Sequence, residues 1–350
     1  MAASVEIRVF HCGQGDTLLI RLDGKKWVLV DCHLPSDGAV EKFLAELERL
    51  DVRRLDLVCL SHPDADHYRG MERVLAHYSV PPRSIGIFCD AGFAGKLAIA
   101  PEKDRIEREI ARLYDLVFRL EEAGTLAYLM VAAHHDAGAE NHQWPEQLAT
   151  VSPLGSRVQA ATYRALLGQT RELPNEYSMV LMLESGVGEE TFRGLLTGDA
   201  GGATLTQALT ATPDATATRF DFAKVAHHGS WNSHRGSPVP QRIRVPGESV
   251  AVVSSSSTSK KLPRREVLND YLNAGWRVYD TGRREHDWPD EAPIGTLLSH
   301  ATFWPDATEP KHDVVVIWSP ESGLAATPLA ARVMAEHTPF YPTARSSPAF

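Results

Sequence analysis

The chain has 350 residues, 43% hydrophobic and 23% charged, which is typical of a folded globular protein with one large domain or two smaller ones. No run of 18 or more apolar residues is present, and this argues against a membrane-spanning helix. The net charge of −9 disfavours a protein that coats nucleic acid, but it leaves open an enzyme that meets nucleic acid at a local basic site.

The N-terminus and the cysteines indicate where the protein resides. Residues 1–10 alternate like a strand and lack the basic region and apolar core of a signal peptide. We therefore expect a cytoplasmic protein with no membrane partner. Cys12, Cys32, Cys59 and Cys89 form no CxxC pair and lie in or beside apolar segments, so buried reduced thiols are the favoured interpretation.

The first 60 residues predict strands around one helix. Short apolar or alternating runs indicate strands at residues 5–10, 17–22, 26–33 and 55–60. Asp23-Gly24, between the second and third runs, is a hairpin signal. Apolar residues at helical spacing over 40–50 predict a helix, with Ser36 or Asp37 as its N-cap.

Strands and helices continue to alternate further along the chain. Strands are predicted at residues 84–89, 179–185, 192–200, 222–230, 249–257, 276–282 and 313–319. A long helix is predicted after Pro101 with its stop at Gly124, and a second helix at 265–274. Residues 133–146 are polar and are expected to form a loop.

We find no internal repeat and no linker. The expected organisation is a single domain over residues 1–336, with a mainly helical insertion near 90–148 and a C-terminal extension from about 283. Residues 337–350 are expected to be a flexible tail.

The most informative stretch follows the strand at 55–60 and reads His-Pro-Asp-Ala-Asp-His. It brings His62, Asp64, Asp66 and His67 into one turn. Imidazole nitrogens and carboxylate oxygens are ligands for zinc, manganese and iron. Two carboxylates so close together repel each other unless a cation neutralises them. The turn therefore indicates a metal site.

This stretch resembles the first metal motif of the metallo-β-lactamase fold superfamily, which usually reads H-x-H-x-D-H; Asp64 replaces the second histidine here. The variant is typical of a group resembling the metal-dependent domain of the DNA-uptake protein ComEC. Further stretches are similar to motifs of that group, in the expected order: VFHCGQGDTLLI, NEYSMVLMLESG with LLTGDA, and KVAHHGSWNS. The resemblance covers scattered blocks over roughly residues 5–282. It implies a four-layer αβ/βα sandwich with the site at the edge between two sheets.

The resemblance also implies a ligand set for two divalent metal ions, zinc or manganese. His62 and Asp64 would bind one metal, Asp66 and His67 the second, and Asp199 would bridge both. Asp66 and Asp199 would also be catalytic, because they would orient the attacking water.

His227 and His228 are adjacent, so on an extended strand they would face opposite ways. The resemblance implies that both lie near the metals and act in catalysis. His227 is the expected further ligand and His228 the expected substrate contact, although the assignment between the two stays open. Ser230, which follows them, is a further candidate for substrate binding.

Other residues would support the site or hold an anionic substrate. Asp16 and Asp31 are expected to position ligand histidines from behind, although for Asp31 a simple turn acid is equally compatible. Lys260 and Lys261 suit phosphate oxygens, with a solvated basic loop as the alternative. Leu262 stands where the group usually has a histidine, so one ligand or proton donor is missing. Three histidines of the C-terminal extension could replace it: His286, His300 and His312.

These observations predict a metal-dependent hydrolase that acts on a phosphodiester, either a small molecule or nucleic-acid-like. One alternative is hydrolysis of another bond, such as a lactone, thioester or amide. A second alternative is a non-catalytic regulatory or partner-binding module with a degraded metal site, which Leu262 would favour. No feature of the sequence indicates an oligomeric state.

Overall fold

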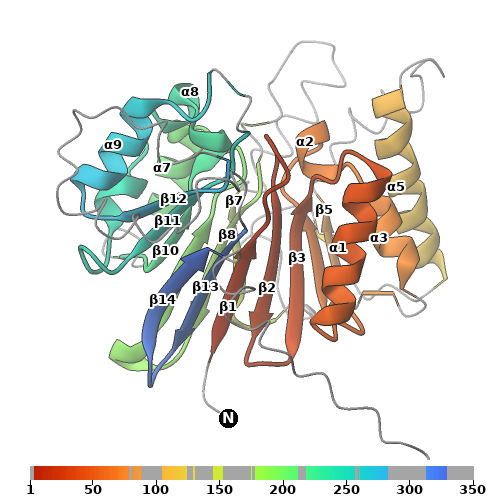
Figure 1. Cartoon of the computed structure of the whole chain (residues 1–350), viewed down its shortest axis with the longest axis horizontal. Helices are drawn as coiled ribbons and strands as arrows, with labels where there is room; N and C mark the ends of the chain where they lie inside the picture. The colour runs from red at the N-terminus through yellow and green to blue at the C-terminus, as the bar shows by residue number, and fades with distance from the viewer. Residues whose placement is uncertain are drawn as a thin grey trace, which may run out of the picture.

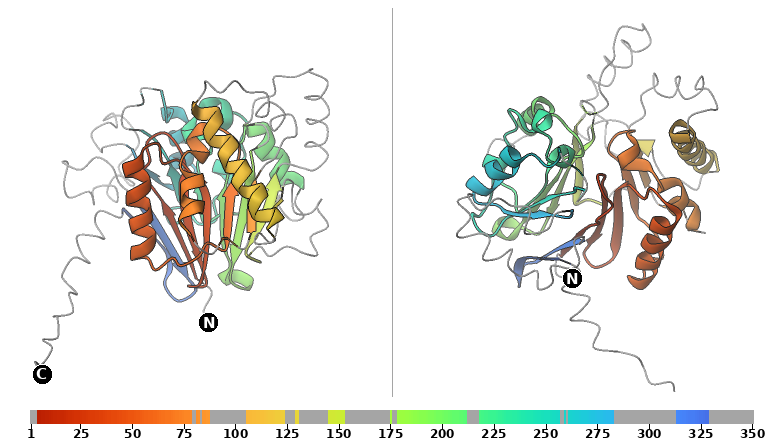
Figure 2. Two further views of the ribbon diagram at one scale, coloured as in Figure 1. Left: turned by 90° about the vertical axis from the view of Figure 1, so that its right-hand side faces the viewer. Right: turned by 45° about the horizontal axis from the view of Figure 1, so that its top comes forward.

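The computed structural model describes residues 4–78, 81–82, 84–87, 105–123, 129–130, 145–152, 175, 178–211, 218–256, 259, 261–282 and 313–328. Two β-sheets face each other at the centre of the molecule, and helices cover their outer faces (Figure 1). The view from above in Figure 2 separates the four layers. The mixed α/β sandwich expected from the resemblance is confirmed.

The first sheet contains the N-terminal strands and the last two strands. Its members are β1 (Val5–Val9), β2 (Thr17–Leu22), β3 (Lys26–Cys32), β4 (Leu57–Leu60), β5 (Ser84–Ile87), β6 (Leu129–Met130), β13 (Val314–Ser319) and β14 (Gly323–Pro328). Their order is β14-β13-β1-β2-β3-β4-β5-β6. The C-terminal hairpin thus extends the sheet beside β1, pairing Val5 with Trp318 and Val9 with Val314.

The second sheet is formed by the middle of the chain. Its members are β7 (Leu148–Ser152), β8 (Val180–Ser185), β9 (Phe192–Leu196), β10 (Phe222–Lys224), β11 (Val250–Val253) and β12 (Arg277–Asp280). Their order is β12-β11-β10-β9-β8-β7, with β9 to β12 parallel. Parallel strands present their carboxyl ends at one edge, where the following turns can meet.

Helices pack on the outer face of each sheet. The first sheet carries α1 (Asp37–Arg49), α2 (Ala65–Tyr68), α3 (Met71–His77) and α5 (Arg105–Glu122). The second carries α7 (Gly202–Ala211), α8 (Trp231–His234) and α9 (Arg265–Asn273). Short 3-10 turns are η3 (Gly188–Glu190), η4 (Ala226–Gly229) and η5 (Val239–Arg242). None of the helices in the described ranges has the length and apolar character needed to cross a bilayer.

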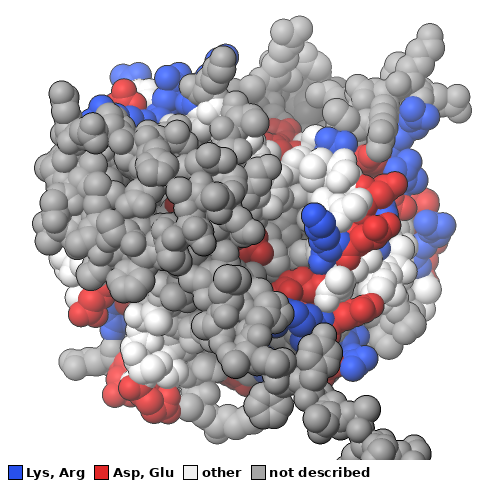
Figure 3. Space-filling view, in the orientation of Figure 1, with Lys and Arg blue, Asp and Glu red and all other residues white. Residues whose placement is uncertain are grey.

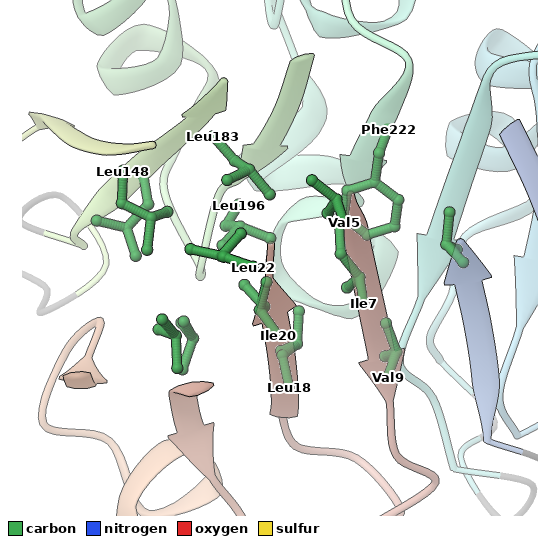
Figure 4. Packing of buried hydrophobic residues seen from close by; sticks show 14 of the residues in the cluster. Val5, Ile7, Val9, Leu18, Ile20, Leu22, Leu148, Leu183, Leu196 and Phe222 are labelled. Atoms are coloured by element: carbon green, nitrogen blue, oxygen red, sulfur yellow. The ribbon is translucent and has the colours of Figure 1, made fainter. Parts of the chain in front are cut away.

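The central core lies between the sheets because alternate residues of each strand point inward. Figure 4 shows this packing, with Val5, Ile7, Val9, Leu18, Ile20, Leu22, Leu148, Leu183, Leu196 and Phe222 labelled. A second cluster joins the outer face of the first sheet to α1, α3 and α5, and a third joins the second sheet to α7 and α9. Packing of the three clusters therefore holds the two sheets face to face. The turns at the ends of their strands keep fixed positions relative to one another.

Most predicted elements are confirmed. Ser36 caps α1, since its hydroxyl accepts a hydrogen bond from the Ala39 amide. Asp23 and Gly24 both have positive φ in the turn between antiparallel β2 and β3, as the hairpin signal predicted. Sequence patterns did not predict β6, β7, β14, α7 or the short helices α2, α3 and α8.

Three predicted strands are too long, since those predicted at 192–200 and 249–257 end at Leu196 and Val253. The strand predicted at 222–230 ends at Lys224, and residues 226–229 form η4. Cys32 and Cys59 are buried free thiols and Cys12 is half-buried. Four predicted features lie outside the described residues: Cys89, residues 133–144 of the loop expected at 133–146, residues 283–312 and the tail at 337–350.

Candidate metal centre

Three turns at the ends of strands meet at one edge of the two sheets. The first follows β4 and carries His62 to His67, the second follows β9 and carries Asp199, and the third is η4 after β10. Gly198 permits the close approach of the first two turns. It has φ +48°, and a Cβ there would lie 2.5 Å from Ser178 Oγ and 2.9 Å from Ser61 Cβ.

Asp199 lies at the centre of this cluster, and four imidazoles face it. The distances from Nε2 to the nearer carboxylate oxygen of Asp199 are 3.8 Å for His62, 3.3 Å for His67, 3.6 Å for His227 and 3.8 Å for His228. The Asp199 carboxylate is buried, as are His62, His67 and His228. Two separate turns therefore aim their ring nitrogens at the carboxylate that the third turn carries.

The opposite nitrogen of each ring, Nδ1, is held by the protein. His67 Nδ1 lies 2.7 Å from Asp31, and His228 Nδ1 lies 3.1 Å from the Ser254 carbonyl. His62 Nδ1 lies 3.0 Å from the hydroxyl of Ser61, which donates its own proton to Asp31. Because Nδ1–H of these rings has an acceptor, Nε2 is left with its lone pair directed into the cluster.

His227 follows the same arrangement from the more open side of the cluster. Its Nδ1 lies 2.9 Å from Ser233 Oγ and 3.1 Å from Asn175 Nδ2, and 28% of its side chain is exposed. Burial lowers the pKa of His227 although the charge of Asp199 opposes this. His227 is thus the member of the group that solvent can reach.

The prediction that His227 and His228 face opposite ways was wrong. Both residues have left-handed backbone angles, φ 47° and 51°, within η4. This compact turn brings both Nε2 atoms toward Asp199, which an extended strand would not do. The assumption of a continuous strand failed because the strand ends three residues before the histidine pair.

Several buried polar atoms in the cluster have no hydrogen-bond partner. They are His62 Nε2, His67 Nε2, His228 Nε2 and Asp199 Oδ1. Leaving a buried polar atom unpaired costs about 1–3 kcal/mol. Four such atoms turned toward one another are the arrangement that a bound cation would satisfy, since it supplies the charge and the acceptor orbitals together.

The close approach of buried carboxylates and imidazoles also shifts the pKa values of these groups. Burial alone would lower the pKa of His67, but the carboxylates of Asp199 and Asp31 outweigh it and raise that pKa well above its ordinary value. Burial is likewise outweighed at His228 by Asp199 and Asp16, so the pKa of His228 is also raised. For Asp66, burial is outweighed by the His228 imidazole, whose Nε2 lies 3.4 Å from the carboxylate, and by the charge of His67, and the pKa falls to about 2. The buried carboxylates therefore stabilise positive charge in the cluster. A bound metal ion would provide that charge in place of the protons on the imidazoles.

The predicted ligands divide into a tight set and two flanking positions. One ligand atom each from Asp66, His67, Asp199 and His228 lies within 4.8 Å of the others. Bonds of about 2.0–2.2 Å to a divalent cation require small inward shifts of these side chains. His62 lies beside this set, with Nε2 3.5 Å from Asp64. The residue in the tight set is His228, whereas the sequence favoured His227 as the ligand.

Asp16 and Asp31 contact the histidines from behind. Asp31 accepts hydrogen bonds from the Ser61 amide at 2.7 Å and from the Ser61 hydroxyl at 2.7 Å, besides its contact with His67. Asp16 Oδ1 lies 3.8 Å from His228 Nδ1 and 2.9 Å from the ammonium of Lys224. Lys224 and Asp16 are buried, and their pair joins the two sheets because β10 carries one and the turn before β2 carries the other.

Sequence reasoning assigned no role to Lys224, Ser61, Ser178 or Ser233. Ser178 Oγ lies 3.3 Å from His62 Nδ1 and accepts the Asp199 amide at 3.0 Å. Ser178 and Lys224 stand inside the quoted motifs, so their position beside aligned site residues was the available signal. Small hydroxyl side chains near a histidine are too common in sequences to mark a site alone.

The remaining predicted residues lie beside the cluster or outside the described chain. Ser230 follows η4, and its amide donates to the His227 carbonyl at 2.8 Å. Lys261 is exposed and Leu262 is half-buried. Lys260 and the histidines considered as substitutes, His286, His300 and His312, lie outside the described residues.

Comparison with known proteins places this site in a family context. Residues 11–139 match the model of the Metallo-beta-lactamase superfamily, a span that includes the 62–67 turn. The match is a likeness to that superfamily over residues 11–139 and does not extend to the rest of the chain. The match does not distinguish the narrower ComEC-like group within that superfamily. A comparison with curated proteins gives no match.

Several solved structures are similar in fold. A diphosphatase of the PhnP family has 13% identity, with 80% of this chain and 95% of that chain covered and a TM-score of 0.40. The short form of human tRNase Z has 14% identity, with 63% and 76% covered and a TM-score of 0.33. The metallo-β-lactamase MIM-1 from Novosphingobium pentaromativorans has 12% identity, with 70% and 83% covered and a TM-score of 0.35.

Proposed function

We propose that this chain is a metal-dependent hydrolase that cleaves a phosphodiester with the help of two divalent cations. The observation that carries the proposal is the set of buried atoms without partners, from His62, His67, His228 and Asp199, that face one another. A packed protein does not leave such atoms unmatched without a reason, and a ligand-binding role is the usual one.

In this proposal, Asp66, His67, Asp199 and His228 would hold one cation. His62 and Asp64 would hold the other and share Asp199 with the first. When bound, such cations polarise the substrate and lower the pKa of a coordinated water toward neutrality. Nitrogen and carboxylate ligands suit zinc, and the added oxygen of Asp64 makes manganese suitable as well.

The protein's own residues would orient these ligands and move a proton. Asp31 and the Ser254 carbonyl hold the Nδ1 atoms of His67 and His228, so the Nε2 atoms keep one direction. His227 is the half-exposed imidazole with the lowered pKa. It is therefore neutral near pH 7, and its Nε2 can exchange a proton with a reacting oxygen of the substrate.

The phosphodiester is favoured over other bonds by the charges around the site. Lys261 and Arg264 are exposed, and neither has an ion-pair partner among the described residues. Free cations beside a metal site suit an anionic substrate. Hydrolysis of a neutral lactone, thioester or amide would not use them. The non-catalytic alternative rests on Leu262, and metal analysis separates it from the proposal.

The test combines metal content with activity after reconstitution with Zn²⁺ or Mn²⁺. Wild-type protein is expected to bind metal and to hydrolyse bis(p-nitrophenyl) phosphate faster than p-nitrophenyl acetate. His62→Ala and Asp199→Ala are each expected to lower kcat/KM about 1000-fold or more, since each removes a member of a cooperating group. Circular dichroism should show both variants folded.

His77→Ala is the matched control, because His77 is a partly exposed histidine on α3 that faces Glu48. It should leave metal content and activity unchanged. Wild-type activity in both site variants would overturn the assignment. A wild-type protein that binds no metal after reconstitution would favour the non-catalytic module.

A further inference from the structure

An open pocket lies beside the metal centre. It has a volume of about 430 Å³, and its lining includes Gln14, Ser230, Trp231, Asn232, Lys261 and Arg264. Ser230 directly follows η4, and Gln14 stands two residues before Asp16. The pocket therefore borders the turn that carries His227 and His228.

Trp231 is the most unusual residue of this pocket. Its exposed fraction is 44%, whereas Trp27, Trp276 and Trp318 are buried. A large apolar ring left in water gives up about 25 cal/mol for each Å² that burial would have removed from solvent. An exposed indole beside a pocket is thus a surface available to a ligand.

The protein supports Trp231 from one side. The ring centroids of Trp231 and His234 lie 5.9 Å apart, and His234 is fixed by a 2.8 Å contact with Asp270. His234 in turn lies 5.9 Å from the buried ring of Tyr271. This series of contacts holds the indole in place before any ligand arrives, which lowers the entropy lost on binding.

Two cations, Lys261 and Arg264, also line the pocket. The amides of Lys261 and Leu262 both donate to Ser259 Oγ, at 3.4 Å and 3.1 Å, and the Arg264 amide donates to the Gly229 carbonyl at 2.9 Å. Gly229 has φ +76°, and a Cβ there would lie 2.5 Å from Pro263 Cβ. The segment that bears the cations is therefore packed directly against η4.

The side-chain amides of Gln14 and Asn232 complete the pocket. Within the described part of the chain, neither makes a side-chain hydrogen bond to protein. The pocket thus combines a supported aromatic face, two cations without ion-pair partners and two free amide groups. An aromatic face binds the flat surface of a nucleobase, cations bind phosphate, and amides bind base edges.

We propose that this pocket binds one nucleotide unit of the substrate, with the base stacked on Trp231 and a phosphate between Lys261 and Arg264. The proposal rests on the proposed function for the bond that is cleaved, and it narrows the substrate to a phosphodiester that carries a nucleobase. A sugar phosphate or an inorganic anion would use the cations but would leave the indole exposed.

The experiment measures binding rather than turnover. Fluorescence anisotropy of a labelled single-stranded oligodeoxynucleotide is compared with that of an abasic strand of equal length, in EDTA so that neither is cleaved. Because stacking contributes about 1–3 kcal/mol per base, Trp231→Ala should weaken binding of the base-bearing strand about 5- to 150-fold. Binding of the abasic strand should not change, and Trp231→Phe should retain part of the affinity.

Phe118→Ala is the matched control, since Phe118 is a similarly exposed aromatic residue on α5. It should bind both strands like the wild type. Lys261→Ala and Arg264→Ala should weaken both strands alike and reduce the salt dependence of binding. Competition between a free mononucleotide and the labelled strand shows whether the natural ligand of the pocket is a nucleotide or a longer nucleic acid.

The outcomes separate this proposal from the proposed function. If Trp231→Ala weakens the abasic strand as much as the base-bearing strand, or weakens neither, the stacking role is overturned. Hydrolysis of bis(p-nitrophenyl) phosphate would still stand in that case. If the protein binds the strand through Trp231 but hydrolyses no phosphodiester, the proposed reaction is overturned. The proposal that the pocket binds a nucleotide unit would then still stand.

Discussion

Two regions of this molecule are rich in ionisable side chains, and they differ in how those side chains are satisfied. The first is the metal cleft, defined here as Asp16, Asp31, His62, Asp64, Asp66, His67, Asp199, Lys224, His227 and His228. The second is the arginine groove beside α1, α3 and α5, defined as Asp37, Arg69, Glu72, Arg73, Glu109 and Arg112, with a volume of about 340 Å³.

The six charges named for the arginine groove form opposite pairs, although Arg69 Nε lacks a hydrogen bond and an exposed Arg108 also lines the groove. Arg73 lies 2.6 Å from Asp37, Arg112 lies 3.2 Å from Glu72 and Arg69 lies 3.4 Å from Glu109. Figure 3 shows acidic and basic side chains interspersed over these helices. In the metal cleft, by contrast, buried nitrogen and oxygen atoms face one another without partners.

The difference shows that a count of charged residues does not identify a site. Exposed, paired charges contribute about 0–1 kcal/mol per pair and need no ligand. Buried groups that the protein orients but does not neutralise are different, because their cost is recovered only when a ligand binds. The metal cleft meets that description and the arginine groove does not.

The largest expected difference in the free energy of unfolding is between two ion pairs, the buried Lys224–Asp16 pair of the metal cleft and the exposed Arg73–Asp37 pair of the groove. Lys224→Met leaves the Asp16 carboxylate buried without its cation, and breaking a buried pair costs about 3–5 kcal/mol. Arg73→Ala, which breaks an exposed pair of the groove, should cost at most about 1 kcal/mol. Urea unfolding measures both.

The double variant Asp16→Asn/Lys224→Met serves as the internal control for that contrast. It should recover part of the lost free energy of unfolding, because no unpaired charge remains. Equal losses for Lys224→Met and Arg73→Ala would remove the distinction between the two regions.

The next largest expected effect is on metal affinity, and it comes from Asp31, the carboxylate that contacts His67 Nδ1. Asp31→Asn should weaken metal binding about 10- to 100-fold, since groups that orient ligand histidines contribute this much. Asparagine tolerates the positive φ of 54° at this position, so the backbone is preserved. Competition with a chromogenic chelator measures the affinity, and Asp37→Asn in the groove is the control. Unchanged affinity in Asp31→Asn would mean that Asp31 is only a turn acid.

The half-buried carboxylate of Asp313, which belongs to neither region, sharpens the comparison. Burial raises the pKa of Asp313 to about 6, although the His11 amide donates to it at 2.6 Å. Between pH 4 and pH 6 the folded state therefore holds a proton that the unfolded chain has released, and the protein loses stability as pH rises. Asp66, beside His228, shows the opposite shift.

Asp313→Asn should consequently be more stable than the wild type at pH 7.5, by a few degrees in Tm. The gain should largely disappear near pH 4, where the wild-type carboxyl is protonated in the folded state and partly protonated in the unfolded chain. Thermal unfolding at the two pH values measures this. A difference in Tm that does not vary with pH would show that Asp313 titrates normally.

Much of the fold was predictable because its signals are local. Alternation in β1 and β2, the Asp23-Gly24 turn and the apolar stripe of α1 each follow from spacing within one segment. The pairing of β13 with β1, more than 300 residues apart in sequence, is set by packing between distant segments and leaves no local signal.

The metal cleft was predictable in its residue types but not in its geometry. The crowding of His62 to His67 and the motif around Asp199 indicated where along the chain the clustered histidines and carboxylates lie. The left-handed turn at His227 and His228 is fixed by contacts with Gly198 and with Pro263 through Gly229, which adjacent residues do not reveal. For the same reason the partner of Asp16, Lys224, was found only in the structure.

The measurement that tests the central claim most directly is a crystal structure of the protein reconstituted with Mn²⁺, with anomalous scattering recorded for manganese. We predict an anomalous peak in contact with Asp199, His67 and His228. A protein that carries manganese by elemental analysis but shows no peak at Asp199 would contradict the account.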